Sequence, residues 1–587
     1  MKNSTYTCIE IFSMFQSYLK FIMKKITIKS IWVIALLLMF NNCTTIKDIE
    51  YSVKENPLQM HADEVTLEIS GKFIEKGLHA KATADVTPLF VCNDGTEIAF
   101  STEMFQGSKA AGNGKVVAKE GTSFSYESTI PYQKCMEEGV VKVRIIAKKG
   151  KKELEPILTD KIADGTVITP YLIQLDDKVV MAADAFQRTT SHDTEAMINY
   201  DKGKFNVKSS ELKQVDITDL KAFALDATTN PRFEMKNVSV QSYASPEGEI
   251  DKNTNLAKDR AESAKAFLVK EMKRMKYEAG QQETFYVLDP KGEDWDGFKT
   301  EVEKTSHEDK ELILRVLQMT KDLDKREQEI RNMAKTYKFL EKEVLPQLRR
   351  SQMVLAYDKV GYSDEELKEL SKSNPDTLNI EELLYTAGLY EDLNEKLRVY
   401  KEAARLFPND WRSTNNVGYI YYLKGDLDAA GENFEKANVA EENATTTNNI
   451  GAVAHMKGDN ERAMELFTAA GSGSECKYNQ GLLNIQQGLY EEAVNNMGDN
   501  KTFNVALATL LSGDAEGSSQ VIDASNTSDE AISYYLKAII GARTNNSAML
   551  LDNLKIAFEK DSALKDKAKR DREFIKFFEN ADFLAIF

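Results

Sequence analysis

The sequence predicts a multidomain α+β protein with an N-terminal β-sandwich, a central α/β sandwich and a C-terminal α-solenoid. Three observations support this fold class. Alternating, β-branched runs fill residues 57–170, strand-like and helix-like segments alternate over residues 171–360, and small residues repeat periodically through residues 377–587. A chain of 587 residues has the length of about three or four domains.

The composition indicates a folded chain and disfavours one class of partner. Hydrophobic residues make up 42% of the sequence and charged residues 29%, which supplies enough apolar material for packed cores. The formal net charge of −17 repels the phosphates of nucleic acid and anionic lipid surfaces. We therefore expect no nucleic-acid partner.

Residues 1–43 have the organisation of an export signal, which we expect to start at Met23. Two lysines follow this methionine, the apolar residues 31–40 come next, and Cys43 stands shortly after them. Ten apolar residues form a helix of about 15 Å, roughly half the thickness of a bilayer core. The segment is therefore expected to be a signal rather than a membrane span.

This N-terminal segment resembles a bacterial lipoprotein signal peptide. The resemblance implies that Cys43 carries a lipid as the first residue of the mature chain, and that residues 44–56 form a polar tether. It also implies that the lipid anchors the chain at the outer membrane, with the periplasmic face favoured and surface exposure as an alternative. The other interpretation is an ordinary cleaved signal followed by an incidental cysteine.

Strand-like runs separated by Gly, Asn and Asp predict a small β-sandwich over residues 57–170. An exported chain meets an oxidising compartment, so Cys92 and Cys135 could form a disulfide, and two buried thiols are the alternative. No pattern in this region indicates chemistry. We expect a spacer or an interaction module.

Residues 171–360 predict one mixed sheet with helices packed on one side, because strands and helices alternate along them. A long charged helical stretch precedes the last strand. The expected elements are strands at 196–205, 237–245, 284–289 and 348–357, with helices at 209–230 and 255–275.

The stretch that leads into the second expected helix contains Gly248, Asn253, Leu256, Arg260 and Ala261. In order and spacing these residues resemble the motif of the OmpA-like domain, a family that binds peptidoglycan. The paired Arg349 and Arg350 resemble those before the family's last strand. An insertion at about 290–345 resembles a variant of the domain found in Bacteroidetes envelope proteins.

In that family an aspartate and an arginine grip the charged end of the peptidoglycan stem peptide. Arg260, expected in the first turn of its helix, would supply the cation, while Ser245 stands where the family has the aspartate. Acidic residues on the same loop, Glu249 among them, could replace the missing charge. The resemblance implies a peptidoglycan site with these candidates: Ser245, Glu247, Asp251, Asn253 and Arg260.

Residues 377–587 have the pattern of repeated helical hairpins. Gly425, Gly458 and Gly488 recur at intervals of 33 and 30 residues, and alanine and Phe/Met positions step with them. The pattern resembles tetratricopeptide repeats (TPR), which implies a solenoid that recruits a protein partner. Four copies are clear up to about residue 503, and one more hairpin is expected near 530–563.

Pairs of asparagines recur one repeat apart in this region. They are Asn415, Asn416, Asn448 and Asn449, and they fall on the expected first helix of each hairpin. Paired amides in a solenoid groove could bind the backbone of a partner. The alternative is polar filler that faces solvent.

No pattern in the sequence indicates catalysis. The five histidines are scattered without metal-ligand spacing, and no phosphate loop or nucleophile motif is present. We expect no enzyme activity, cofactor or metal. The sequence predicts a non-enzymatic outer-membrane lipoprotein that contacts peptidoglycan and scaffolds an unidentified envelope protein. The alternative is a subunit of an outer-membrane or surface assembly, in which the OmpA-like domain has lost its ligand and acts only in protein docking.

Overall fold

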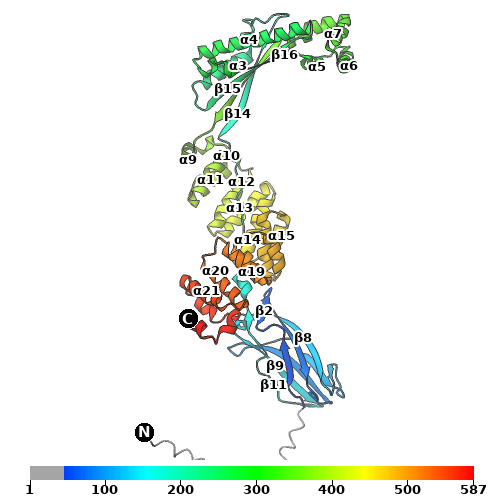
Figure 1. The fold of residues 1–587 in the computed structure, drawn as a ribbon, viewed down its shortest axis with the longest axis vertical. Helices are drawn as coiled ribbons and strands as arrows, with labels where there is room; N and C mark the ends of the chain where they lie inside the picture. Colours follow the sequence, from blue (N-terminus) through cyan, green and yellow to red (C-terminus); the bar gives the residue numbers. More distant parts are fainter. Residues whose placement is uncertain (1–44) are drawn as a thin grey trace, which may run out of the picture. The chain divides into compact units, whose positions relative to one another are not determined.

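The computed structural model describes residues 45–587, so the predicted signal and Cys43 lie outside the described residues. The chain divides into two compact units (Figure 1). The first combines the described residues up to Ala182 with Asn409–Phe587, and the second is Ala183–Pro408. The second unit is therefore an insertion within the first. The predicted mixed α+β class, with N-terminal sheets and C-terminal helices, is confirmed.

The first unit begins with two β-sheets that enclose apolar cores between them. The inward-facing residues alternate along the strands, as Val65, Leu67 and Ile69 do. One sheet contains β1 (Ile49–Val53), β2 (Leu58–His61), β3 (Glu64–Phe73), β8 (Thr122–Pro131) and β13 (Thr166–Val167). The other contains β4 (Ala82–Val91), β5 (Glu97–Ala99), β6 (Glu103–Gly107), β7 (Lys115–Val117), β9 (Val140–Lys149), β10 (Lys152–Glu153), β11 (Ile157–Leu158) and β12 (Ala163–Asp164).

Two sequence interpretations of this region are resolved by the structure. Cys92 and Cys135 form a disulfide with their Cα atoms 5.5 Å apart. The predicted polar tether over residues 44–56 is wrong for Ile49–Val53, because this stretch pairs with β3 and buries Ile49. The alternation of apolar and polar residues in IEYSV suits a strand with one buried face.

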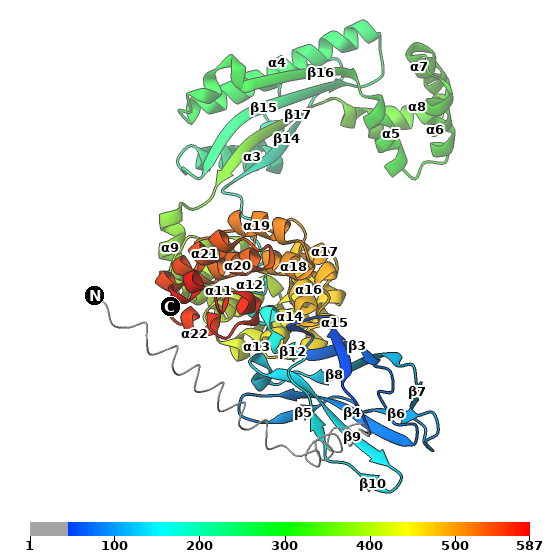
Figure 2. The same cartoon turned by 60° about the horizontal axis from the view of Figure 1, so that its bottom comes forward.

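The first unit also contains helical hairpins made from residues after Asn409, and Figure 2 shows them beside the strands of the sandwich. In three of the five hairpins named below, the turn is a Gly-Asp pair, as at Gly425-Asp426. The glycine has a φ of 77°, which favours glycine, and the aspartate side chain accepts a hydrogen bond from the N–H of Ala429. The pairs are α12 (Trp411–Leu423) with α13 (Leu427–Ala440), α14 (Ala444–Met456) with α15 (Asn460–Ala470), α16 (Ser474–Gln486) with α17 (Tyr490–Met497), α18 (Phe503–Leu511) with α19 (Ala515–Asp523), and α20 (Ala531–Arg543) with α21 (Ser547–Lys560).

The second unit contains a four-stranded sheet in the order β14-β17-β15-β16, where β15 and β16 run parallel and the other pairs are antiparallel. Helix α4 packs on the sheet through alanines such as Ala257, Ala261 and Ala264, whose small side chains allow close approach. The elements are β14 (Thr189–Asn199), α3 (Val215–Ala227), β15 (Phe233–Ala244), α4 (Ile250–Arg274), β16 (Tyr286–Glu293) and β17 (Arg350–Val360).

The insertion between β16 and β17 forms a small helical subdomain. It has an apolar core that includes Phe298, Ile313 and Leu340. Its helices are α5 (Trp295–Lys304), α6 (Lys310–Met319), α7 (Leu323–Asn332) and α8 (Ala334–Phe339). The second unit ends with α9 (Asp364–Ser373), α10 (Ile380–Gly388) and α11 (Leu393–Leu406), of which the last two form a hairpin.

Three sequence-based boundaries in the central region are corrected. The first strand covers Thr189–Asn199 rather than 196–205. Helix α4 begins at Ile250 rather than at 255, and it places the carboxylate of Asp251 in its first turn, where the helix dipole favours a negative charge. Residues 171–182 belong to the first unit and not to this α/β domain.

No helix among residues 45–587 is both long enough and apolar enough to cross a membrane.

Candidate functional site

We call the first helix of each of the first four hairpins an inner helix; these are α12, α14, α16 and α18. The inner helices bind an extended segment of the same chain. We call residues 174–182, which come after the β-sandwich, the strap. Four asparagines each pair with one strap residue through both main-chain groups. The pairs are Asn504 with Gln174, Asn479 with Lys178, Asn449 with Val180, and Asn416 with Ala182.

The geometry of one pair shows how this recognition works. The N–H of Val180 donates to Oδ1 of Asn449 at 2.7 Å, and Nδ2 of Asn449 donates to the carbonyl of Val180 at 2.7 Å. A side-chain amide carries one acceptor and two donors, so it can satisfy both polar groups of a peptide residue at once. The side chain of Val180 plays no part in these bonds.

A second set of asparagines links neighbouring repeats. Nδ2 of Asn448 donates to the carbonyl of Lys178 at 2.8 Å, and Asn415 donates to that of Val180 at 3.1 Å. Asn449 also donates to Oδ1 of Asn415 at 2.9 Å. The result is a continuous hydrogen-bonded ladder between helices.

The register follows from the two periodicities. In an extended chain, alternate residues present their main-chain groups to the same side, so Lys178, Val180 and Ala182 face the helices together. The asparagines that meet them, Asn479 and Asn449 among them, lie one repeat apart on successive inner helices. Between Lys178 and Ala182, one hairpin thus serves two strap residues, and the strap runs antiparallel to the order of the repeats.

The asparagine candidates therefore bind backbone, and the backbone is that of this chain. Asn415, Asn416, Asn448 and Asn449 are all fully buried. The interpretation of solvent-facing polar filler is wrong, because the strap covers these side chains. Two further ladder residues, Asn479 and Asn504, were missed, although Asn479 stands 30 residues after Asn449 and so continues the repeat.

One strap side chain is bound specifically. Oδ1 of Asp177 lies 2.7 Å from Nδ1 of His455, and both side chains are almost completely buried. The other ring nitrogen of His455 lies 3.2 Å from Oε1 of Gln486, so both nitrogens face oxygens. Burial opposes the charge on His455, but Asp177 outweighs it and the pKa of His455 is raised. Burial also raises the pKa of Asp177, against the opposite effect of His455.

The neighbouring Asp176 is bound in a more polar setting. The hydroxyl of Tyr478 donates to both carboxylate oxygens of Asp176, at 2.9 and 3.0 Å, and Nδ2 of Asn504 donates at 2.8 Å. The ammonium of Lys178 pairs with the same carboxylate at 2.7 Å and lies over the Tyr478 ring. Asp176 and Asp177 of the strap thus contact a histidine, a tyrosine and an asparagine amide.

Arg260, the predicted cation of the peptidoglycan site, is not accessible to a ligand. It is only 1% exposed and its guanidinium donates to three backbone carbonyls, those of Asp201, Lys204 and Tyr243, at 2.7 to 3.2 Å. Burial lowers the pKa of Arg260 to about 10. Because α4 begins at Ile250, Arg260 lies about three turns into the helix and not in its first turn, so the helix N-terminus is not beside it. The prediction of an open cation here is wrong.

The loop ahead of α4 does hold an inward carboxylate, which is that of Glu247. Its Oε1 accepts hydrogen bonds from Arg349 at 2.6 and 3.0 Å and from the Ser245 hydroxyl at 2.6 Å. Its Oε2 pairs with the ammonium of Lys202 at 3.0 Å. Ser245 and Glu247 therefore lie together, as predicted for the loop, but their charge is neutralised by this chain's own Arg349.

Asn253 and Asp251 contribute to the first turns of α4 rather than to a free loop. Nδ2 of Asn253 donates to the carbonyl of Ser245 at 3.3 Å and to Oε1 of Glu293 at 2.8 Å, and Asn253 is buried. Asp251 is exposed at the start of the helix. The structure thus gathers Ser245, Glu247 and Asn253 but leaves Asp251 outside.

The helical insertion contributes to the closure of this region. Glu341 of the insertion pairs with Lys202 at 2.8 Å. Burial raises the pKa of Glu327 on α7, and the nearby backbone of Gly248 opposes this shift. Arg350 pairs with Asp294, the residue that caps α5. Figure 1 shows these helices at the end of the sheet where β16 finishes. The insertion therefore occupies the neighbourhood in which the resemblance places a ligand.

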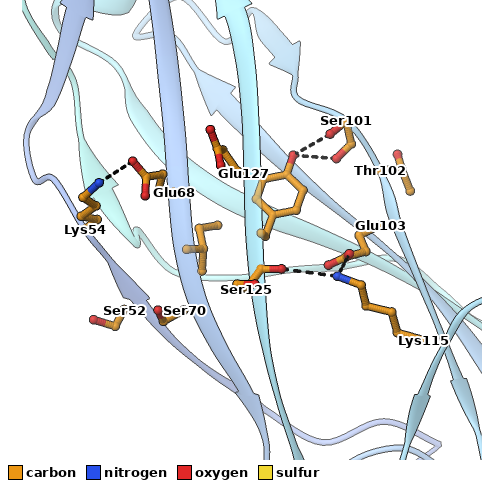
Figure 3. Close-up of a pocket in the computed structure, with 12 residues that line it drawn as sticks. Ser52, Lys54, Glu68, Ser70, Ser101, Thr102, Glu103, Lys115, Ser125 and Glu127 are labelled. Atoms are coloured by element: carbon orange, nitrogen blue, oxygen red, sulfur yellow. Dashed lines mark hydrogen bonds and ion pairs between the residues drawn. The ribbon is translucent and has the colours of Figure 1, made fainter.

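A hollow of about 620 Å³ lies on the β-sandwich (Figure 3). It is lined by hydroxyl groups and charged side chains, of which Lys54 pairs with Glu68 and Lys115 with Glu103. Among residues 45–587, no group of three or more His, Cys, Asp or Glu side chains could hold a metal ion.

Comparisons with known proteins add little to this geometry. No family model and no curated protein matches the chain. Among solved structures, the pilF protein of Pseudomonas aeruginosa matches at 14% identity and a TM-score of 0.28, covering 36% of this chain and 98% of its own. A tetratricopeptide repeat protein from Parabacteroides merdae matches at 16% identity and a TM-score of 0.28, covering 35% and 90%. Matches with TM-scores this low do not establish a shared fold, so the repeat assignment rests on the observed hairpins.

Proposed function

We propose that this protein is a non-enzymatic outer-membrane lipoprotein, anchored through Cys43, that acts as a scaffold by protein docking. The observation that carries the proposal is the asparagine ladder. Its groove grips a segment of the same chain and so joins the β-sandwich to the repeats.

The docking role is favoured over peptidoglycan binding by the state of the α/β domain. A zwitterionic stem peptide needs an anion and a cation that are free to pair with it. Here Glu247 is paired with Arg349, and the donors of Arg260 point to backbone carbonyls. A ligand would have to replace these contacts, and burial makes that costly.

Sedimentation with purified wall sacculi tests this choice. The mature chain is expected to stay in the supernatant, and to stay there when the exposed Asp251 is changed to Ala. Sedimentation of the wild-type chain that disappears in Glu247→Gln, with thermal stability unchanged, would instead establish peptidoglycan binding.

In-cell photocrosslinking tests the docking itself. A crosslinking residue at Val215, a 72% exposed position on α3, is expected to capture an envelope protein in a discrete band. Val439, an 89% exposed position on α13, provides a matched position in the other unit. The absence of a discrete band at every exposed position of the α/β domain would contradict docking through that domain.

The lipid anchor has its own test. Cys43→Ser is expected to abolish acylation in mass spectrometry and to release the chain from the membrane fraction. Retention of the variant in that fraction without acylation would contradict lipid anchoring.

A further inference from the structure

The strap has the features of a bound peptide rather than of a core strand. It pairs with no β-strand in the described part of the chain, and its hydrogen bonds go to side chains of the helices. Leu175 and Met181 are 45% and 42% exposed, so one side of the strap faces solvent. Its main chain is held through groups that almost any peptide could supply.

The groove nevertheless contacts the side chains of Asp176 and Asp177, and it encloses the second of them. At Lys178, Val180 and Ala182 the asparagines contact only N–H and C=O groups. At Asp177 the carboxylate is enclosed and lies against His455. A residue without an acceptor at this position would leave Nδ1 of His455 unpaired in a buried place, and asparagine would keep an acceptor but lose the negative charge, so both are unfavourable.

The surroundings of His455 explain why an acid is preferred there. Besides Asp177, His455 faces Oε1 of Gln486 on α16, which also accepts a hydrogen bond from Asn460. The carboxylate of Asp176 and the phenol of Tyr422 on α12 lie close enough to act on this site electrostatically. None of these groups supplies a cation to Asp177, so His455 is its partner.

We propose that the inner groove is a binding site for extended peptides that carry an acidic residue next to His455, and that the strap is its resident, exchangeable ligand. The ladder supplies affinity that is independent of sequence, and the His455 contact supplies the preference for an acid. The proposal goes beyond the scaffold role, which requires only that the strap be bound.

The strap is covalently attached to the chain that forms its groove, and this attachment determines how easily another peptide can replace it. A segment attached to its own groove acts at an effective concentration of about a millimolar or more, so a free peptide competes poorly with the intact strap. Weakening the strap should therefore expose the site. Val180→Pro does so directly, because proline lacks the N–H that Asn449 accepts.

Fluorescence polarisation on the full chain tests the proposal. The probe is a labelled peptide with the sequence of residues 172–184. We expect it to bind Val180→Pro at least tenfold more tightly than the wild-type chain, and a probe with Asn in place of Asp177 to bind at least tenfold more weakly. Equal binding of the two probes would overturn the proposal, as would no binding to a Val180→Pro chain that still unfolds cooperatively.

Hydrogen exchange on the wild-type chain decides the matter independently, even if Val180→Pro does not fold. The amides of Lys178, Val180 and Ala182 are expected to exchange by local opening, before the central amides of α14 and α16. If they exchange only together with those helix amides, the strap is an inseparable part of the core and the proposal fails. Crosslinking at Val215 is unaffected by either outcome, so the scaffold role is judged separately.

Discussion

At the scale of single residues, the molecule depends on buried amides that satisfy a backbone segment. Asn449→Ala removes the acceptor of the Val180 N–H and the donor to Asn415 Oδ1, while the carbonyl of Val180 keeps its hydrogen bond from Asn415. We expect a loss of roughly 2–4 kcal/mol in the free energy of unfolding, measured by urea denaturation. Asn433→Ala is the matched control, since Asn433 donates only to a carbonyl of its own helix, and we expect it to change the free energy by less than about 1 kcal/mol.

The buried His455–Asp177 contact predicts a pH dependence. The pKa of His455 is raised above its ordinary 6.5, so its stabilisation is complete below that pH and is lost as pH rises through the raised value. The raised pKa of Asp177 acts in the same direction. The melting temperature should be higher at pH 6 than at pH 8.5, and the difference should shrink in His455→Gln. An equal difference in both proteins would contradict this prediction.

We expect Arg260 to have a structural role. Arg260→Met removes the donors of three backbone carbonyls, and we expect roughly 2–4 kcal/mol of destabilisation in the α/β domain. Calorimetry should show the transition of that domain at a lower temperature. An unchanged transition would mean that the carbonyls find other partners and that the guanidinium is dispensable.

At the scale of elements, the disulfide connects the end of β4 to the short helix before β9. Cys92→Ser with Cys135→Ser removes a link that spans 43 residues of sequence. We expect roughly 2–4 kcal/mol of lost stability in the sandwich, because the unfolded chain becomes less restricted. Denaturation of the oxidised wild type against the double variant measures it, and equal midpoints would contradict the prediction.

The elements also show what could be predicted from the sequence. The repeated turn glycines predicted the hairpins, because Gly425 and Gly458 adopt a conformation that favours glycine. The same Gly-Asp signal stands at Gly513-Asp514 and marks α18 with α19, a hairpin that the repeat register beyond residue 503 did not reveal. In α4, polar residues at its start were predicted as loop, since their local preference for turns competes with the helix.

The sequence indicated the residues of the candidate sites, but not the groups that these residues contact. The asparagine pairs left two interpretations open, recognition of a partner's backbone and polar filler that faces solvent, and the structure shows that they bind backbone of this chain. The strap could not be foreseen, because residues 174–182 have neither helical nor strand periodicity, and their partners lie more than 230 residues away. Motif spacing likewise placed Ser245 and Arg260 near each other, but it carried no information about the carbonyls and the Arg349 side chain that close the region.

At the scale of the whole molecule, we infer that the strap and the asparagine groove hold the first unit together. The sharpest measurement is to insert a protease site after Ala183, at the boundary of the two compact units, and to cut the folded chain. Gel filtration should then show the sandwich fragment, which carries the strap, eluting with the remainder of the chain, and separating from it in Asn449→Ala with Asn479→Ala. Separation of the cut wild-type fragments, or continued association in the double variant, would contradict the account.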